Sequence, residues 1–262
     1  MGRRALFKII SLLVLVVIIA LYVYFSFDLK LGNSGLREWI FTRGVDMASR
    51  AELAEFQRWW DTEGDWVEEP NERRKGMSGV QRIERDGKTL YVKRQVMHLF
   101  HSLRYPFGRP TIVREIQVIN ELSAAGVIVP KIVYGKALQI NGEWRALLVT
   151  EDMKDFVCIG DWYKQKQNQA CEPEVMNELF KQIAVAFKKM HSVNRQHGCC
   201  YVRHIYVKSH GDVQAGFLDL EKSRRRWVRE KAVRHDFKQL EKYLEPIPPE
   251  DWQRVKEHYY SL

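Results

Sequence analysis

Cysteine is scarce in this chain of 262 residues, which contains only Cys158, Cys171, Cys199 and Cys200. Two of the four are neighbours that do not easily bridge each other, and the set has no evenly spaced disulfide framework. Internal repeats and low-complexity runs are also absent from the sequence. These absences argue against a disulfide-stapled secreted domain and indicate a folded domain in a reducing compartment, hence the cytoplasm.

Acidic residues are too few to balance the basic ones: 33 Asp and Glu stand against 42 Lys and Arg, for a formal net charge of +9. A basic balance of this size favours anionic partners, and nucleotide phosphates, acidic lipid and nucleic acid all qualify. Hydrophobic residues make up 45% of the chain and aromatic residues 12%, so the chain can build a core and is not disordered by composition.

Long apolar runs are limited to one, at residues 9–27, which contains no charged residue. As a helix this run would be about 28 Å long, close to the hydrocarbon thickness of a bilayer. It follows a short basic flank at residues 1–8 and lacks the small-residue end of a cleaved signal peptide. The sequence therefore predicts an uncleaved transmembrane helix. Basic residues flank its two ends almost equally, so its orientation stays open.

Turn signals in the rest of the chain predict three β-hairpins. Asp86-Gly87 lies between two β-rich runs, and Asn141-Gly142 repeats the pattern further along. Both dipeptides are strong signals for two-residue hairpin turns. A third pair of strand-like runs is joined around residues 210–212.

Two amphipathic helices lie between the hairpins, at residues 111–126 and 172–191. Each places four apolar residues on one helical face. Gly126 is a plausible stop for the first helix. The aligned apolar residues are Ile112, Ile116, Ile119 and Leu122 in the first helix, and Leu179, Ile183, Ala186 and Met190 in the second.

The order of these elements predicts a small, mostly-β lobe at residues 71–152 and a more helical lobe at residues 153–262. Residues 28–70 precede both lobes, and we interpret them as a juxtamembrane connector. Helical spacing within residues 49–60 predicts that the connector contains a helix, which would pack on the following domain. The alternative for its tryptophans is a place at a membrane interface.

Six segments carry a resemblance to a known family: PNERRKGMSGVQRI, LYVKRQ, RYPFGRPTIVREI, LLVTEDM, HGCCYVRHIYV and FLDLEKSRRR. Their order and spacing, from about residue 70 to residue 240, resemble the lipopolysaccharide core kinase family, the Kdo/WaaP/InaA group, and most of all its InaA-like branch. The resemblance implies a two-lobed, protein-kinase-like α+β fold that binds ATP and Mg²⁺, here with an N-terminal transmembrane helix.

Nucleotide-binding residues are expected in the first lobe. Lys93 lies in a predicted strand, as the kinase strand lysine does, and Glu115 in the next helix would hold it toward the α/β-phosphates. Gly76 and Gly79 would let backbone N–H groups approach phosphate, and Glu151 is a candidate contact of the adenine. Each residue also has an ordinary explanation. Lys93 could be an exposed strand lysine, and Glu115 could simply favour a helix N-terminus. The two glycines could form a turn, and Glu151 could lie in a loop after a buried strand.

Asp219 ends the apolar run AGFL, and the resemblance aligns it with the metal-binding Asp of the kinase D-F-G motif. Leu220 and Glu221 replace the Phe and Gly of that motif. A carboxylate at this strand end is expected to bind the Mg²⁺ that bridges two phosphates.

The catalytic loop departs from the kinase pattern H-R-D-x-x-x-x-N. Cys199 stands at the position of the base, and His204 stands at the position of the second metal ligand, where it would bind metal or donate a hydrogen bond. Because a thiol is mostly neutral unless it is activated, we predict that Cys199 is passive; the alternative is an activated thiolate. Asp236 is then a candidate for orienting the acceptor.

A zinc site is a weaker alternative for the same loop, because six Cys and His residues gather between His191 and His210. No CxxC pair occurs among them, and adjacent cysteines suit a tetrahedral site poorly.

A basic run at residues 222–234, KSRRRWVREKAVR, holds seven Lys and Arg. It could bind acidic sugar phosphates or anionic lipid headgroups, or it could be a solvated helix face. No recognition module for nucleic acid accompanies the charge, so we expect no nucleic-acid partner.

Together these features predict an ATP-dependent phosphotransferase of the lipopolysaccharide core sugar kinase type. Its partners would be nucleotide, an anionic glycolipid or core sugar, and the bacterial inner membrane, with a single span and a cytoplasmic kinase-like domain. The alternative, which the missing catalytic Asp favours, is a kinase-fold pseudoenzyme that binds nucleotide or glycolipid and regulates or scaffolds envelope assembly.

Overall fold

The computed structural model describes residues 49–73, 76–102, 105–165 and 171–262, and Glu52–Leu262 form one compact unit. The predicted transmembrane helix at residues 9–27 lies outside the described residues, as does the connector up to residue 48. Within the part of the chain that the structure describes, no helix is both long enough and apolar enough to cross a membrane.

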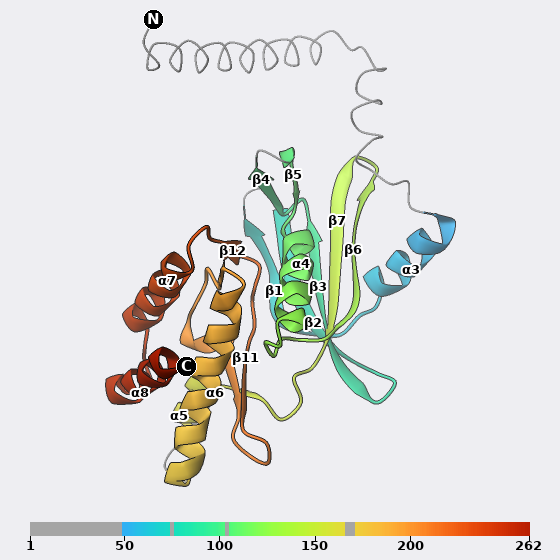
Figure 1. Cartoon of the computed structure of the whole chain (residues 1–262). Helices are drawn as coiled ribbons and strands as arrows, with labels where there is room; N and C mark the ends of the chain where they lie inside the picture. The colour runs from blue at the N-terminus through green and yellow to red at the C-terminus, as the bar shows by residue number, and fades with distance from the viewer. Residues whose placement is uncertain (1–48, 74–75, 103–104, 166–170) are drawn as a thin grey trace, which may run out of the picture. The chain divides into compact units, whose positions relative to one another are not determined.

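An antiparallel sheet of five strands forms the first half of the compact unit (Figure 1), in the order β1-β2-β3-β7-β6. The strands are β1 (Asp65–Arg73), β2 (Gly76–Arg85), β3 (Lys88–Val96), β6 (Ile132–Ile140) and β7 (Glu143–Glu151). β3 is the central strand, so a residue on it is flanked by hydrogen-bonded neighbours on both sides.

The two predicted turns close the β2–β3 and β6–β7 hairpins. Asp86 and Gly87 have φ angles of 53° and 71°, and Asn141 and Gly142 have φ angles of 51° and 83°. Positive φ at both central positions is the type I′ geometry, whose twist matches that of the flanking strands. The prediction of both turns is confirmed.

The strand β1 was not predicted, and it begins inside the range assigned to the connector. Its sequence, DWVEEPNER, is largely polar and lacks the alternation that marks a half-buried strand. Pro70 lies in it, and the strand pairs with β2 across two register shifts. Both features suit the edge of a sheet, where only one side of the strand needs hydrogen bonds.

The predicted connector helix is α3 (Arg50–Trp60), which packs on the protein. It buries Phe56 and Trp59, and the Trp59 ring stacks on Tyr134 of β6 at 6.0 Å between centroids. A salt bridge of 2.6 Å from Lys136 Nζ to Glu52 Oε1 lies beside this contact. The prediction that the connector helix packs on the following domain is confirmed.

The helix α4 (Thr111–Ala124) packs against β6 and β7. Its apolar face buries Ile112, Ile119 and Leu122, as predicted, whereas Ile116 is only partly buried. Gly126, with φ of 75°, follows the last turn, and the Val127 N–H donates to the Leu122 carbonyl at 2.9 Å. A left-handed glycine and this hydrogen bond end the helix in a Schellman motif.

A short hairpin that was not predicted, β4 (Leu99–Ser102) and β5 (Tyr105–Pro110), precedes α4.

Helices dominate the second half of the unit, as the sequence predicts. The core of this half centres on Phe187 of α6, whose ring lies 4.8 Å from Phe217, 5.5 Å from Phe237 and 6.1 Å from Trp252 between centroids. The helices are α5 (Ile159–Lys164), α6 (Pro173–Ser192), α7 (Arg229–Lys242) and α8 (Pro249–Ser261), and α6, α7 and α8 lie together in Figure 1.

Short strands connect these helices and carry the third predicted hairpin. β10 (Ile205–Lys208) pairs with β11 (Gln214–Phe217), and Lys208 stands opposite Gln214. The other short elements are β8 (Val157–Cys158), β9 (Arg195–Gln196), the 3₁₀ turn η2 (Val202–His204) and β12 (Arg224–Arg225). Residues 197–204, the predicted catalytic loop, therefore lie between β9 and β10.

Candidate functional site

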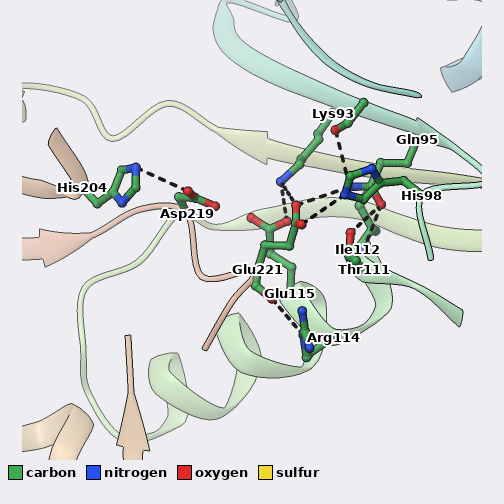
Figure 2. Close-up of polar contacts among 11 residues, drawn as sticks. Lys93, Gln95, His98, Thr111, Ile112, Arg114, Glu115, His204, Asp219 and Glu221 are labelled. Atoms are coloured by element: carbon green, nitrogen blue, oxygen red, sulfur yellow. Dashed lines mark hydrogen bonds and ion pairs between the residues drawn. The ribbon is translucent and has the colours of Figure 1, made fainter. Parts of the chain in front are cut away.

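Lys93 of β3 lies between two carboxylates (Figure 2). Its Nζ is 2.8 Å from Glu115 Oε2 and 2.9 Å from Glu221 Oε2. All three side chains are largely buried. Burial alone lowers the pKa of Lys93, but the two carboxylates raise it well above its ordinary value, so the ammonium group stays charged. The predicted Lys93–Glu115 pair is present, and its contact with phosphate remains a prediction.

The sequence pattern explains why these two side chains meet. Leu90 and Val92 are buried on one face of β3, and the alternation of a strand directs Lys93 to the opposite face. Glu115 follows Ile112 by three residues and therefore shares the buried face of α4. A carboxylate that is only 6% exposed is costly without a cationic partner, and Lys93 supplies one.

Gln95 links β3 directly to the start of α4. Its Oε1 accepts hydrogen bonds from Thr111 Oγ1 at 3.0 Å and from the Ile112 N–H at 3.2 Å. Pro110 occupies the N-cap position and provides no side-chain cap. The strand that carries Lys93 thus caps the helix that carries Glu115, which fixes the spacing of the pair. No local sequence signal predicts a cap supplied from another element.

Glu221 is a site residue that sequence reasoning missed. Besides Lys93, its carboxylate lies 3.4 Å from His98 Nε2, and its backbone carbonyl accepts a hydrogen bond from Arg114 Nε at 2.8 Å. Burial raises the pKa of Glu221, but His98 and Lys93 lower it by more, so the carboxylate is ionised. The sequence does show that Glu221 replaces the glycine of the D-F-G motif. It does not show that Lys93 is the partner of this carboxylate.

Asp219 adopts a left-handed backbone with φ of 54°, which is uncommon outside glycine and recurs at functional sites. Its Oδ2 lies 3.3 Å from His204 Nε2. His204 Nδ1 lies 2.7 Å from the Cys199 carbonyl oxygen, which can only accept, so Nδ1 carries the proton. Burial lowers the pKa of His204, so the ring is neutral at pH 7 and its Nε2 presents a lone pair beside the carboxylate.

This pair fits a divalent cation that is also bound by phosphates. Mg²⁺ is usually held by one or two protein ligands together with substrate phosphates and water. Arg203 Nε donates to the same His204 Nε2 at 3.0 Å, so the exposed Arg203 side chain would have to move aside. The zinc alternative needs more ligands, and the described residues contain no group of three or more suitable side chains.

Cys199 is 4% exposed at the position of the kinase base. Burial raises the pKa of its thiol, although nearby Lys222 acts in the opposite direction. At pH 7 the group is therefore a neutral thiol and not a thiolate. This supports the prediction of a passive residue.

Asp236 does not lie where it could orient an acceptor, and that prediction is corrected. It is fully buried on α7, and its carboxylate accepts hydrogen bonds from the backbone N–H groups of His197 at 2.7 Å and Gly198 at 3.3 Å. His191 and His235 contact the same carboxylate at 3.2 and 3.0 Å. Asp236 therefore fixes the backbone of the predicted catalytic loop at His197 and Gly198.

The remaining predicted binding residues have structural partners of their own. A Cβ on Gly76 would lie 2.5 Å from the Met97 carbonyl oxygen, and a Cβ on Gly79 would lie 2.9 Å from the Trp66 ring, so packing alone requires both glycines. Glu151 forms salt bridges with Lys88 at 2.8 Å and Lys131 at 3.2 Å. Contacts of these three residues with nucleotide remain predictions.

The chain is similar to known proteins over most of its length. The family model described as the lipopolysaccharide kinase (Kdo/WaaP) family matches residues 57–259. Protein InaA of Escherichia coli (strain K12) is 68% identical over 216 residues, which are 82% of this chain and all of that protein. The structure of WaaP in complex with acyl carrier protein aligns with a TM-score of 0.60 and 19% identity, over 79% of this chain and 83% of that chain.

The WaaP alignment confirms the expected kinase-like mixed α/β fold, and at this level of identity it speaks for the fold alone. The family model covers most of the described residues, including β3, α4 and the loop from His197 to Asp219. The chain belongs to the lipopolysaccharide kinase (Kdo/WaaP) family.

Proposed function

We propose that this protein binds Mg-ATP in the Lys93 site and acts as a phosphotransferase on a lipopolysaccharide core sugar. The observation that carries the proposal is the buried Lys93–Glu115 pair. Asp219, just after β11, and His204, just before β10, form a second pair. Kinase-like folds use a lysine–glutamate pair to hold the α/β-phosphates and an aspartate to hold the metal.

Each residue of the site has one task in this proposal. Lys93 binds phosphate oxygens, and Glu115 keeps the ammonium group in place. Asp219 Oδ2 and His204 Nε2 would hold Mg²⁺, which neutralises phosphate charge when it is bound. Cys199 stays protonated, so the acceptor hydroxyl loses its proton without help from that side chain. A loose phosphoryl transition state depends mainly on positioning and charge, and it tolerates the lack of a strong base.

The second candidate function is a pseudoenzyme that binds nucleotide without rapid turnover. The buried neutral thiol of Cys199 favours it, because a positioned general base typically contributes a factor of about 10² to 10⁴ in rate. The two functions share the nucleotide site and differ in turnover alone.

For the acceptor, we propose that the basic run at residues 222–234 contacts anionic glycolipid at the inner membrane. Arg224 and Arg229 are exposed, and Trp227 between them is 99% exposed. Arginine pairs with phosphate and carboxylate, and tryptophan is enriched where membrane meets water. Because the WaaP structure contains acyl carrier protein, a carrier protein is the competing occupant of this surface.

A Mg-ATP titration of the full-length protein in detergent tests the nucleotide proposal. Saturating ligand should raise the unfolding temperature, because a ligand at 100 times its Kd adds about 2.7 kcal/mol of stability. Addition of core sugar should then release ADP if the protein is an enzyme. Stabilisation without ADP release would favour the pseudoenzyme, and no stabilisation would refute both.

We further propose that residues 9–27 span the inner membrane once and that the kinase-like domain is cytoplasmic, because ATP is supplied there. A reporter fused after Leu262 measures this directly. Activity of a cytoplasm-specific reporter is expected. Activity of a periplasm-specific reporter alone would refute the kinase proposal, although the fold would stand.

A further inference from the structure

Glu221 occupies the side of Lys93 that Glu115 leaves free. The two carboxylates reach the same ammonium nitrogen from different elements, Glu115 from α4 and Glu221 from the loop after Asp219 (Figure 2). The Glu221 side chain is 15% exposed, and that of Lys93 is 17% exposed. An incoming phosphate would therefore meet a lysine whose open side already holds an anion.

The partners of Glu221 hold it in this place. Its Oε2 lies 2.9 Å from Lys93 Nζ and 3.4 Å from Gln95 Nε2, and its Oε1 lies 3.4 Å from His98 Nε2. Arg114 Nε fixes the backbone of the same residue through its carbonyl oxygen at 2.8 Å. A phosphate at Lys93 would therefore break side-chain contacts of Glu221, while the Arg114 hydrogen bond could keep its backbone in place.

The charge of the cluster opposes a bare phosphate. Glu115, Glu221 and Asp219 all act to raise the pKa of Lys93. Burial raises the pKa of Glu115 itself, whereas His98 and Lys93 keep Glu221 ionised. A nucleotide without a cation adds more negative charge to this largely buried group, where electrostatic interactions are stronger than in water. A nucleotide with a divalent cation brings a counter-charge for any carboxylate that it displaces.

We propose that Glu221 is an intramolecular occupant of the phosphate position and that it makes nucleotide binding depend on a divalent cation. The inference rests on the proposed nucleotide-binding function and deepens it. On binding, Lys93 exchanges the Glu221 carboxylate for a phosphate oxygen. Glu221 would then be free to turn toward a cation bound by Asp219, which lies two residues earlier. Metal-free nucleotide lacks that cation and has to displace Glu221 without compensation.

Glu221→Gln tests this exchange by binding alone. The glutamine keeps the size of the side chain and removes its charge. Kd values for ATP are measured by calorimetry on the full-length protein, with Mg²⁺ and with excess chelator. We expect the variant to bind metal-free ATP about tenfold more tightly than the wild type, since a hydrogen bond to a charged group contributes at least that factor. Affinity for Mg-ATP should change much less, so the ratio of the two Kd values falls.

Two further variants serve as controls. Glu143→Gln removes one exposed negative charge from the same sheet, at the β6–β7 turn, and should leave the Kd ratio unchanged. Glu221→Asp keeps the charge but shortens the side chain by one methylene, which weakens its reach to Lys93. It should lower the ratio by a smaller factor, and it replaces Glu221→Gln as the test if that variant does not fold.

The outcomes separate this inference from the function on which it rests. If the wild type binds Mg-ATP but Glu221→Gln leaves the ratio unchanged, Glu221 is only a structural partner of Lys93 and the inference is wrong. Weaker binding of both ligand forms by the variant would also overturn it. If the wild type fails to bind either form and Glu221→Gln binds, the occupant is confirmed and the resting protein is closed to nucleotide. Failure of every variant to bind either form refutes the nucleotide site together with the inference.

Discussion

His204 contacts two residues that are set up for different chemistry. Its Nδ1 donates to the backbone carbonyl of Cys199, and its Nε2 faces the carboxylate of Asp219. The Cys199 thiol is buried and protonated, whereas the Asp219 side chain is 39% exposed. At the scale of single residues, the proposed function therefore assigns metal binding to His204 and Asp219 and no proton transfer to Cys199.

Single substitutions should separate these two sides. Cys199→Ala should leave Mg-ATP affinity intact and change any single-turnover rate by less than about threefold, because a protonated thiol takes no proton. Asp219→Asn should weaken Mg-ATP binding and lower the rate by about a hundredfold or more, because it removes charge from the metal site. Both are measured by calorimetry and single-turnover assays.

The rates of Cys199→Ala and Asp219→Asn could also contradict the passive role of Cys199. A loss of about a hundredfold in Cys199→Ala alone would make the thiol an active base. Asp236 stays unchanged in both variants, so the loop keeps its position. Wild-type protein with tight Mg-ATP binding and no turnover would identify the pseudoenzyme.

The buried carboxylate of Asp236 should make the stability of the protein depend on pH. Burial raises the pKa of Asp236, but hydrogen bonds from His191 and His235 lower it by more, so that the pKa falls to about 2. An unfolded aspartate has a pKa of about 3.9, so the folded state gains stability from the carboxylate above that pH. This gain is lost as the pH falls from about 4 through 2.

Asp236→Asn should therefore be less stable than the wild type by about 2 kcal/mol at pH 7, since buried hydrogen bonds to a charged acceptor are lost. The difference should shrink steadily as the pH is lowered from 5 to 2. Urea denaturation at several pH values measures it. A difference that stays constant over this range would show that the charge of Asp236 plays no part.

At the scale of elements, the helix α4 depends on a cap from the neighbouring strand. Gln95→Leu removes the acceptor for Thr111 Oγ1 and for the Ile112 N–H, both buried. We expect a loss of about 2 kcal/mol in the free energy of unfolding. Mg-ATP affinity should fall as well, because α4 carries Glu115.

Gln117→Leu is the matched control for this prediction. Gln117 lies on the exposed face of the same helix, so its replacement should change stability by less than about 0.5 kcal/mol. Equal effects of the two substitutions in urea denaturation would mean that the cap has no special role.

At the scale of the whole molecule, the basic run is expected to face the membrane. Arg225 already pairs with Glu121 at 2.5 Å, and Arg226 donates to Gln196, so Arg224 and Arg229 are the better test. Arg224→Gln with Arg229→Gln should weaken contact with an anionic bilayer by about 2 kcal/mol, or roughly 30-fold, at about 1 kcal/mol for each charge.

Hydrogen exchange of the full-length protein in lipid nanodiscs measures this contact. Residues 222–234 should be protected in anionic discs and not in neutral ones, and the double variant should lose the protection. Lys164→Gln with Lys181→Gln, on exposed faces of α5 and α6, serves as the charge control. Protection that appears only when an acyl carrier protein is added would assign the surface to that partner.

Local features of this protein follow from the sequence by itself. The type I′ turns at Asp86-Gly87 and Asn141-Gly142 depend on two adjacent residues that tolerate positive φ. The buried faces of α4 and α6 follow from helical spacing. The positions of Lys93, Glu115 and Asp219 within their elements were also predictable, because motif spacing along one strand, one helix and one loop identifies them.

Other features depended on packing between distant segments. Glu221 lies 128 residues from Lys93 in the chain, the Gln95 cap comes from a different element, and the burial of Asp236 depends on α7 packing under the loop. Short-range backbone preferences are set by neighbouring residues, whereas a contact between distant side chains exists only after whole elements have packed. For this reason the sequence alone determined which residues are candidates for binding a nucleotide, and only the tertiary structure decided that the Glu221 carboxylate contacts Lys93.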